Sequence, residues 1–535
     1  MSNELLKISD LNVSFKTPNG NFVAVDNLSL SINKGETVAL VGESGSGKST
    51  TALSILGLLA YPMAFHNKGS IKFKNIELLN ANDSVLQKIR GNKVGMIFQE
   101  PMMSLNPLHK IKKQIKESLI IHNKLSKTQI SNRIFELLNL VGLYHTNEHL
   151  NKYPHQLSGG QRQRVMIAIA IANNPDLLIA DEPTTALDVT IQLQILSLLK
   201  DIQSKLGMSI LLITHDLNIV RHMAQNVYIM NKGNVIEFGK VKFVLTKPKT
   251  MYTKSLLKAV PLDIKRETSF SPGPKILSIK NLKVYFPIKK GFFNRTIGYF
   301  KAVDDISLFL HKGTTLGIVG ESGSGKTTLA QAILNLIPST GNIFFKDINI
   351  STMDNSYRRH LQYVFQDPFS SLSPRLSVHE IIAEGLEVNN IGNSKQERKN
   401  LVLKALNDVG MNRDSMYKYP HEFSGGQRQR IAIARALALN PEIIICDEAV
   451  SALDVSIQAQ IIKLLSNLRN KFSLSYIFIA HDLPVVRDLA DRVIVMKSGK
   501  IVEEGIVEDI FDNPQHSYTQ DLLKASPLVN KLING

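Results

Sequence analysis

Two glycine-rich loops in this chain combine residue types and spacing that suit phosphate binding. Residues 42–49 match the pattern G-x-x-x-x-G-K-[ST] without deviation. In such a loop the glycines let backbone N–H groups point at phosphate oxygens, and the following helix presents its positive end to the same anion. Lys48 would then reach the terminal phosphates, and Ser49 would hold Mg²⁺. The predicted phosphate-binding residues of this stretch are Gly42, Glu43, Ser44, Gly45, Ser46, Gly47, Lys48, Ser49 and Thr50.

The second loop repeats the first 278 positions later. Apolar runs at residues 37–41 and 315–319 precede the two loops and read as buried strands. A repeat of this length is not a solenoid period, so it indicates a duplicated domain. The predicted residues of the second loop are Gly320, Glu321, Ser322, Gly323, Ser324, Gly325, Lys326, Thr327 and Thr328.

Two carboxylates follow a further apolar run at residues 177–180. A buried strand that ends in this way can place Asp181 on Mg²⁺ and Glu182 beside an attacking water as general base. Gln99 comes directly after the apolar run 94–98. Its amide can lie near Mg²⁺ or near the attacking water, although a glutamine at a strand end is weak evidence when read alone.

A second anion-binding geometry is predicted at residues 157–164, which read Leu-Ser-Gly-Gly-Gln-Arg-Gln-Arg and open a helix. A serine hydroxyl and unobstructed backbone N–H groups at a helix start suit an anion. Read alone, the same residues are equally consistent with a plain N-cap turn. The residues concerned are Ser158, Gly159, Gly160 and Gln161.

A histidine, His215, ends the apolar run 210–214. A lone histidine at a strand end is usually a core or surface residue. Its place after all the preceding motifs favours contact with a γ-phosphate.

The second half contains the complete set again, and from the serine-glycine-glycine stretch onward each equivalent pair lies 266 positions apart. Its members are Gln366, Ser424, Gly425, Gly426, Gln427, Asp447, Glu448, Asp454 and His481.

This order of motifs resembles the nucleotide-binding domain of ATP-binding cassette (ABC) transporters, in which the Ser-Gly-Gly-Gln signature is specific among phosphate-loop proteins. The resemblance implies an α/β fold with two cassettes in tandem, each with an ATP-binding core, an antiparallel β subdomain and a helical subdomain. It implies ATP and Mg²⁺ as cofactors, with each signature facing the other half's ATP. The implied catalytic residues are Glu182, His215, Glu448 and His481, and the implied metal ligands are Ser49, Gln99, Asp181, Thr327, Gln366 and Asp447.

The two halves also end alike, at residues 247–261 and 513–527. These tails resemble the C-terminal extension of oligopeptide/dipeptide importer ATPases, and the fused arrangement is similar to the ATPases of microcin C, peptide and glutathione uptake systems. The resemblance implies two integral membrane permease subunits and a periplasmic or extracellular peptide-binding protein as partners. It also implies peripheral attachment to the cytoplasmic face of the inner membrane. Some members carry an iron–sulfur cluster in the tail, but Cys446 is the only cysteine here, so no cluster is expected.

The composition is that of a globular protein of more than one domain, with 535 residues, 43% hydrophobic and 20% charged. We predict a first cassette at residues 1–260, a linker rich in proline and serine at 261–275, and a second cassette at 276–535. No run of 18 apolar residues and no secretory signal is visible. The net charge of +17 fits an anionic partner, but a lysine-rich solvated surface with two phosphate loops is the favoured explanation, and no nucleic-acid partner is expected.

Aromatic residues near the start of each half leave two interpretations open. Phe15 and Phe286 could stack on an adenine ring, or they could be ordinary aromatics of the sheet. The second half carries a basic and aromatic insert at 287–300 that would touch lipid or a partner, or form a solvated hairpin.

Three rival classes fit the sequence less well. A ribosome-binding tandem ABC factor needs a long charged helical linker, and 261–275 is too short. A DNA-repair or chromosome ATPase needs a coiled coil or a Cys-x-x-Cys hook, and the chain has neither. An exporter with a fused membrane domain is excluded because no run of 18 apolar residues is present. An exporter whose membrane domain is a separate chain is not excluded. The sequence does not select the peptide that is carried.

Overall fold

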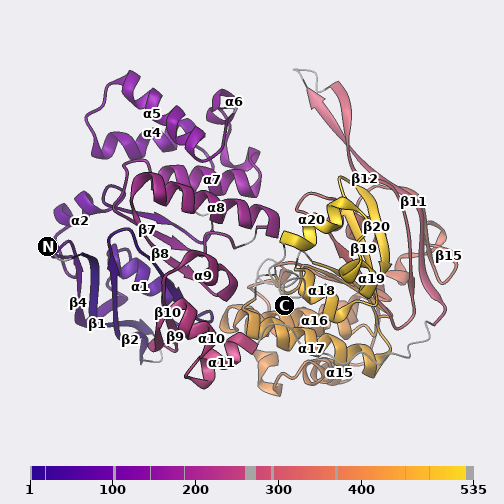
Figure 1. The fold of residues 1–535 in the computed structure, drawn as a ribbon. Helices are drawn as coiled ribbons and strands as arrows, with labels where there is room; N and C mark the ends of the chain where they lie inside the picture. The colour runs from indigo at the N-terminus through magenta and orange to yellow at the C-terminus, as the bar shows by residue number, and fades with distance from the viewer. Residues whose placement is uncertain are drawn as a thin grey trace. The chain divides into compact units, whose positions relative to one another are not determined.

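The computed structural model describes residues 3–17, 20–100, 104–144, 146–185, 187–258, 273–290, 295–367, 371–451, 453–480 and 482–525. Most of the predicted linker, His481, and residues 18 and 19 lie outside these described residues. The chain divides into two compact units, residues 1–187 with 191–260 and residues 188–190 with 261–535 (Figure 1). The domain boundaries at 260 and 276 stay predictions.

A six-stranded sheet forms the centre of the first unit, in the order β10-β9-β3-β8-β7-β6. All its neighbours pair in parallel except β9 and β10, which are antiparallel. Its central strands are runs of buried apolar residues, as expected of a sheet covered on both faces. Because parallel strands end at one edge, the polar residues that follow them are brought together there. The strands are β3 (Thr37–Val41), β6 (Val94–Ile97), β7 (Leu177–Asp181), β8 (Ser209–Thr214), β9 (Asn226–Asn231) and β10 (Asn234–Lys240).

A second, antiparallel sheet of the first unit has the order β2-β1-β4-β5. Its apolar faces join the central sheet and the first helix in one hydrophobic core. β1 pairs with β2, and β4 pairs with both β1 and β5, all antiparallel. The strands are β1 (Glu4–Thr17), β2 (Gly20–Asn33), β4 (Ala64–Phe73) and β5 (Ile76–Glu77).

Helices of the first unit fall into two groups (Figure 1). One group lies along the sheet and comprises α1 (Lys48–Ile55), α2 (Asp83–Ile89), α8 (Val189–Leu206), α9 (Leu217–Met223), α10 (Val241–Thr246) and α11 (Met251–Lys258). The other group is the predicted helical subdomain, with α4 (Ile111–His122), α5 (Lys127–Leu140) and α6 (Thr146–Leu150) before the signature and α7 (Gly159–Ala170) beginning inside it. Two helices begin inside their motifs, α1 at Lys48 and α7 at Gly159.

The second unit repeats this architecture. Its six-stranded sheet has the order β16-β17-β18-β13-β19-β20, and comprises β13 (Thr315–Val319), β16 (Leu361–Val364), β17 (Ile443–Asp447), β18 (Ser475–Ile479), β19 (Arg492–Lys497) and β20 (Lys500–Ile506). Its antiparallel sheet has the order β12-β11-β14-β15, and comprises β11 (Lys275–Lys290), β12 (Arg295–His311), β14 (Thr340–Phe345) and β15 (Ile348–Asn349). Its helices are α12 (Lys326–Ile333), α14 (Val378–Val388), α15 (Lys395–Asp408), α16 (Gly425–Leu437), α17 (Val455–Phe472), α18 (Leu483–Leu489), α19 (Val507–Asp512) and α20 (Ser517–Ala525).

The insert of the second half forms the outer part of an antiparallel ribbon, in which β11 pairs with β12 as far as Lys290 opposite Arg295. Figure 1 shows this ribbon extending beyond the rest of its sheet. Ile297 and Tyr299 on it are 62% and 60% exposed. The described part of the insert is therefore an exposed hairpin, and its contact with lipid or a partner stays a prediction. Among the described helices of both units, none is long and apolar enough to cross a bilayer.

Candidate nucleotide site

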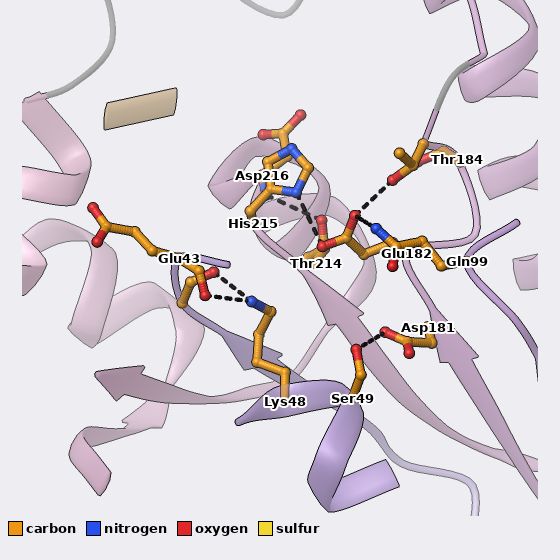
Figure 2. A network of polar contacts seen from close by, with 12 residues as sticks. Glu43, Lys48, Ser49, Gln99, Asp181, Glu182, Thr184, Thr214, His215 and Asp216 are labelled. Carbon is orange, nitrogen blue, oxygen red and sulfur yellow. Dashed lines mark hydrogen bonds and ion pairs between the residues drawn. The ribbon is translucent and has the colours of Figure 1, made fainter. Parts of the chain in front are cut away.

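The phosphate loop of each unit lies between a central strand and the helix that follows it. The ammonium of Lys48 donates hydrogen bonds to the carbonyls of Gly42 and Glu43, both at 2.8 Å (Figure 2). Lys326 makes the same pair of contacts, at 2.7 and 2.8 Å. Both lysines are 5% exposed, and burial lowers the pKa of Lys326. Each loop thus closes around the ammonium group of its own lysine.

The glycine before the loop lysine cannot be replaced in either unit. Gly47 has φ +100°, and a Cβ there would lie 2.5 Å from the carbonyl oxygen of Ala24. Gly325 has φ +103°, and its Cβ would lie 2.0 Å from the carbonyl oxygen of Ala302. The left-handed backbone and the contact with the antiparallel sheet both require glycine. The sheet therefore fixes where the loop can lie.

Two of the three predicted metal ligands of the first unit, Ser49 and Asp181, are in contact, while Gln99 is hydrogen-bonded to Glu182. Asp181 ends β7, and its Oδ1 accepts a hydrogen bond from Ser49 Oγ at 3.2 Å (Figure 2). Burial and the neighbouring Glu182 raise the pKa of Asp181 to about 6, against the opposing hydrogen bond from Ser49. A buried carboxylate next to a hydroxyl at the loop is a suitable position for a cation to neutralise the charge.

The equivalent carboxylate of the second unit has a different neighbour. The hydroxyl of Tyr363 on β16 donates to Asp447 Oδ2 at 2.5 Å. Burial, aided by the negative charge of Asp447, raises the pKa of Tyr363, so that the hydroxyl stays a donor. The strand register places Met96 at the matching position of the first unit, and a thioether cannot donate this bond. The two sites therefore differ in whether the aspartate accepts a hydrogen bond from the neighbouring edge strand.

A hydrogen-bond network surrounds Glu182. Its Oε2 accepts from Gln99 Nε2 at 3.0 Å and from Thr185 Oγ1 at 2.8 Å, and its Oε1 lies 3.3 Å from Nδ1 of His215. Burial alone would raise the pKa of Glu182, but the contact with His215 and the hydrogen bond from Thr185 outweigh it and lower the pKa to about 2. Figure 2 shows Gln99 and His215 converging on this carboxylate from separate strand ends. Glu182 is thus held as the anion, the form a general base requires.

Both candidate general bases have an unusual backbone. Glu182 has φ +47° and Glu448 has φ +46°, a region rarely adopted by residues other than glycine. Each N–H nevertheless donates to the neighbouring strand, to Ile213 and Ile479 at 2.9 Å. The strand ends in a sharp turn that directs the glutamate away from its aspartate. Glu448 Oε2 accepts from Gln366 Nε2 at 2.6 Å, which repeats one contact of the first network. The Ser451 hydroxyl donates to the backbone carbonyl of Glu448, and His481 lies outside the described residues.

The signature residues open α7 and α16 with a capping box. Ser158 Oγ accepts from the Gln161 N–H at 3.3 Å, and Gln161 Oε1 accepts from the Ser158 N–H at 3.1 Å. Ser424 and Gln427 repeat these bonds at 3.4 and 3.1 Å. The N-cap interpretation is therefore correct as local structure. The role of the signature residues in nucleotide binding stays a prediction.

The donor set suits a hard divalent cation. Hydroxyl, carboxylate and amide oxygens are Mg²⁺ ligands, and Mg²⁺ is usually held by one or two carboxylates together with phosphates. Asp447 Oδ1 is buried without a hydrogen-bond partner, which fits an oxygen reserved for a cation. Within the described ranges, no group of three or more histidine, cysteine and acidic residues is placed to hold an ion by itself. The residues present fit Mg²⁺ bound with a nucleotide.

The two early aromatics differ in their surroundings. Phe15 is partly buried and packs against the core of the first unit, while Phe286 is 44% exposed. Their stacking on adenine stays a prediction. The sequence analysis missed Thr185 and Tyr363. Thr185 stands three residues after Glu182, a spacing that signals a local hydrogen bond, whereas only the strand register reveals Tyr363.

The sequence also matches known proteins over nearly its whole length. Residues 25–185 and 303–451 match the ABC transporter family, and residues 502–534 match the family described as oligopeptide/dipeptide transporter, C-terminal region. The peptidoglycan transport ATP-binding protein YejF of Agrobacterium fabrum is 52% identical, over 98% of this chain and 96% of that protein. The glutathione import ATP-binding proteins GsiA of Escherichia coli and Salmonella typhimurium are 43% and 42% identical, over 98% and 99% of this chain and 90% of each protein.

Proposed function

The chain belongs to the ABC transporter family as the ATP-hydrolysing subunit of an importer of the oligopeptide/dipeptide type, and we propose that it energises peptide uptake across the inner membrane. The observation that supports the proposal is the match of the second tail, residues 502–534, to the C-terminal region of oligopeptide/dipeptide transporters. The first tail resembles the second in sequence. The importer family implies membrane permease partners. We propose two separate permease subunits, a periplasmic or extracellular peptide-binding protein acting through them, and attachment to the cytoplasmic face of that membrane.

We propose that each ATP site is shared between the two halves. The resemblance to the ABC family supports this, because its cassettes close head to tail. Site one would combine Lys48, Ser49, Gln99, Asp181, Glu182 and His215 with Ser424, Gly425 and Gly426. Site two would combine Lys326, Thr327, Gln366, Asp447, Glu448 and His481 with Ser158, Gly159 and Gly160.

Each protein group has a defined task in the proposed hydrolysis. Lys48 and the loop N–H groups bind the phosphates, and Mg²⁺ held through Ser49 and Asp181 would neutralise the charge that develops on them. Glu182, ionised and fixed by its three neighbours, accepts a proton from water at its carboxylate. His215 orients that carboxylate from the adjacent strand end. The second site would use its equivalent residues in the same way.

The Tyr363 hydroxyl is expected to make the Mg²⁺ requirement of the two sites unequal. Tyr363→Phe removes one hydrogen bond to Asp447, and a bond to a charged group contributes roughly 1.5–3 kcal/mol. Because Tyr363 supports Asp447 both with and without Mg²⁺, only part of this free energy affects Mg²⁺ binding, and we expect the half-saturating Mg²⁺ concentration of site two to change by about two- to tenfold. The measurement is ATP turnover against Mg²⁺ in a Glu182→Gln background. Met96→Leu in a Glu448→Gln background is the matched control, because it alters the equivalent strand position of site one, which has no hydroxyl. An equal shift there would contradict a role for the hydroxyl.

Reconstitution tests the proposed function. The chain assembled in vesicles with its permease is expected to hydrolyse ATP slowly until a peptide-loaded binding protein is added outside, and then severalfold faster. Parallel samples with glutathione test the cargo named for the GsiA relatives. Full activity without any cargo would contradict the proposal, and stimulation by glutathione alone would change the cargo class.

A further inference from the structure

The two tails carry a tyrosine–threonine pair at equivalent positions. Tyr252 and Thr253 lie in α11, and Tyr518 and Thr519 lie in α20, 266 positions later. Neither pair takes part in the catalytic constellation described above. Their environments are nevertheless the same in both units, which points to a shared task.

The tail of the first unit is anchored by a buried carboxylate. Glu237 on β10 accepts hydrogen bonds from the backbone N–H groups of Lys249 and Thr250 at 2.9 and 3.1 Å, and from the Thr250 hydroxyl at 3.1 Å. Thr253 is fully buried, with its hydroxyl 2.8 Å from that of Thr250. Burial acts to raise the pKa of Glu237, but these hydrogen bonds lower it overall. The segment before α11 is thereby held against the central sheet.

The second unit repeats the anchor. Glu503 on β20 accepts from the N–H groups of Gln515 and His516 at 2.7 and 3.1 Å. Thr519 is 1% exposed. The neighbouring Tyr518 is 6% exposed, and its ring lies under the ammonium of Lys497 at 4.4 Å. The tail helix is thus packed into its own cassette.

Each anchored tyrosine ends at a phosphate loop. The Glu43 N–H donates to the Tyr252 hydroxyl at 3.2 Å, and the Glu321 N–H donates to the Tyr518 hydroxyl at 3.0 Å. The carbonyl of the same loop residue accepts from the loop lysine at 2.8 Å in both units. The second residue of each loop is therefore held on one side by the tail and on the other by the lysine that binds phosphate.

We propose that Tyr252 and Tyr518 are positioning residues that hold the phosphate loops in their nucleotide-binding conformation, so that docking of each tail sets the ATP affinity of its own cassette. The inference requires only that the loops bind ATP and does not depend on the cargo. A loop that has lost this contact must be ordered by the nucleotide itself, which weakens binding.

The test removes only the hydroxyl groups. Tyr252→Phe, Tyr518→Phe and the double variant of the full chain are titrated with a fluorescent N-methylanthraniloyl ATP, without hydrolysis. Loss of one hydrogen bond is expected to weaken binding at the affected site by about two- to tenfold. Tyr228→Phe is the matched control, because the Tyr228 hydroxyl also accepts a backbone N–H, that of Ser31 at 3.4 Å, but not from the loop.

Two further readouts separate positioning from a general loss of stability. The phenylalanine variants should raise KM for ATP and keep kcat, whereas partial unfolding would lower kcat alone. Glu237→Gln should weaken ATP binding as Tyr252→Phe does. Combining Glu237→Gln with Tyr252→Phe should weaken binding little further, since both substitutions act through one contact. Unchanged affinity in the two phenylalanine variants, an equal loss in Tyr228→Phe, or full additivity with Glu237→Gln would each overturn the proposal.

Discussion

Glu182→Gln is expected to lower ATP turnover at site one by at least about tenfold, and Glu448→Gln to do the same at site two. The substitution keeps the shape of the side chain and removes the anion. In the first site, Gln99, Thr185 and His215 surround a carboxylate whose pKa is lowered to about 2, so the anion is the working form. The amide of glutamine is too weak a base to accept the proton in its place.

The measurement is phosphate release by each single variant, with ATP binding recorded alongside. Binding should persist in both variants, because the loop lysines are untouched. Glu36→Gln is the matched control, since Glu36 also accepts hydrogen bonds, from the N–H and the side chain of Asn33 at 2.9 and 3.0 Å, but lies outside the site. If either active-site variant turns over ATP at the wild-type rate, that half does not hydrolyse and the proposal of two working sites is wrong.

Most of the candidate site could be predicted from sequence because it is built at strand ends. Asp181 and His215 each close a run of buried apolar residues, and parallel strands bring their carboxyl ends to one edge. The sheet order confirms that these runs are neighbours, β7 beside β8 and β8 beside β3. The motifs therefore specify both the fold class and which side chains meet.

The contacts that sequence could not reveal depend on strand register or on long separations. The Tyr363 hydroxyl reaches Asp447 only because β16 and β17 pair in one particular register, and the matching Met96 has no such bond. Tyr252 meets the phosphate loop across 209 residues, and no local pattern encodes that approach. The starts of two helices also depend on the motifs themselves, since loop glycines and a capping box allow α1 and α7 to begin inside them.

The signature glycines offer the test of whether the two halves share their sites. A Cβ added at Gly159 or Gly425 would meet Leu187 or Leu453 at 3.5 Å, an ordinary contact. The next glycines are unsuitable, because a Cβ at Gly426 would lie 2.4 Å from an isoleucine methyl group. Glutamine at the first position therefore projects bulk from the helix start without a clash inside its own cassette.

Gly425→Gln in a Glu448→Gln background is expected to abolish the remaining turnover. In that background only site one hydrolyses, and the proposed pairing places Gly425 against its γ-phosphate. Gly159→Gln in the same background is the matched control and should do much less, since it belongs to the silenced site. In the Glu182→Gln background the two results should be reversed, so that Gly159→Gln abolishes turnover and Gly425→Gln does much less. If Gly159 is critical and Gly425 dispensable while site one works, each cassette closes its own site and the composite arrangement is wrong.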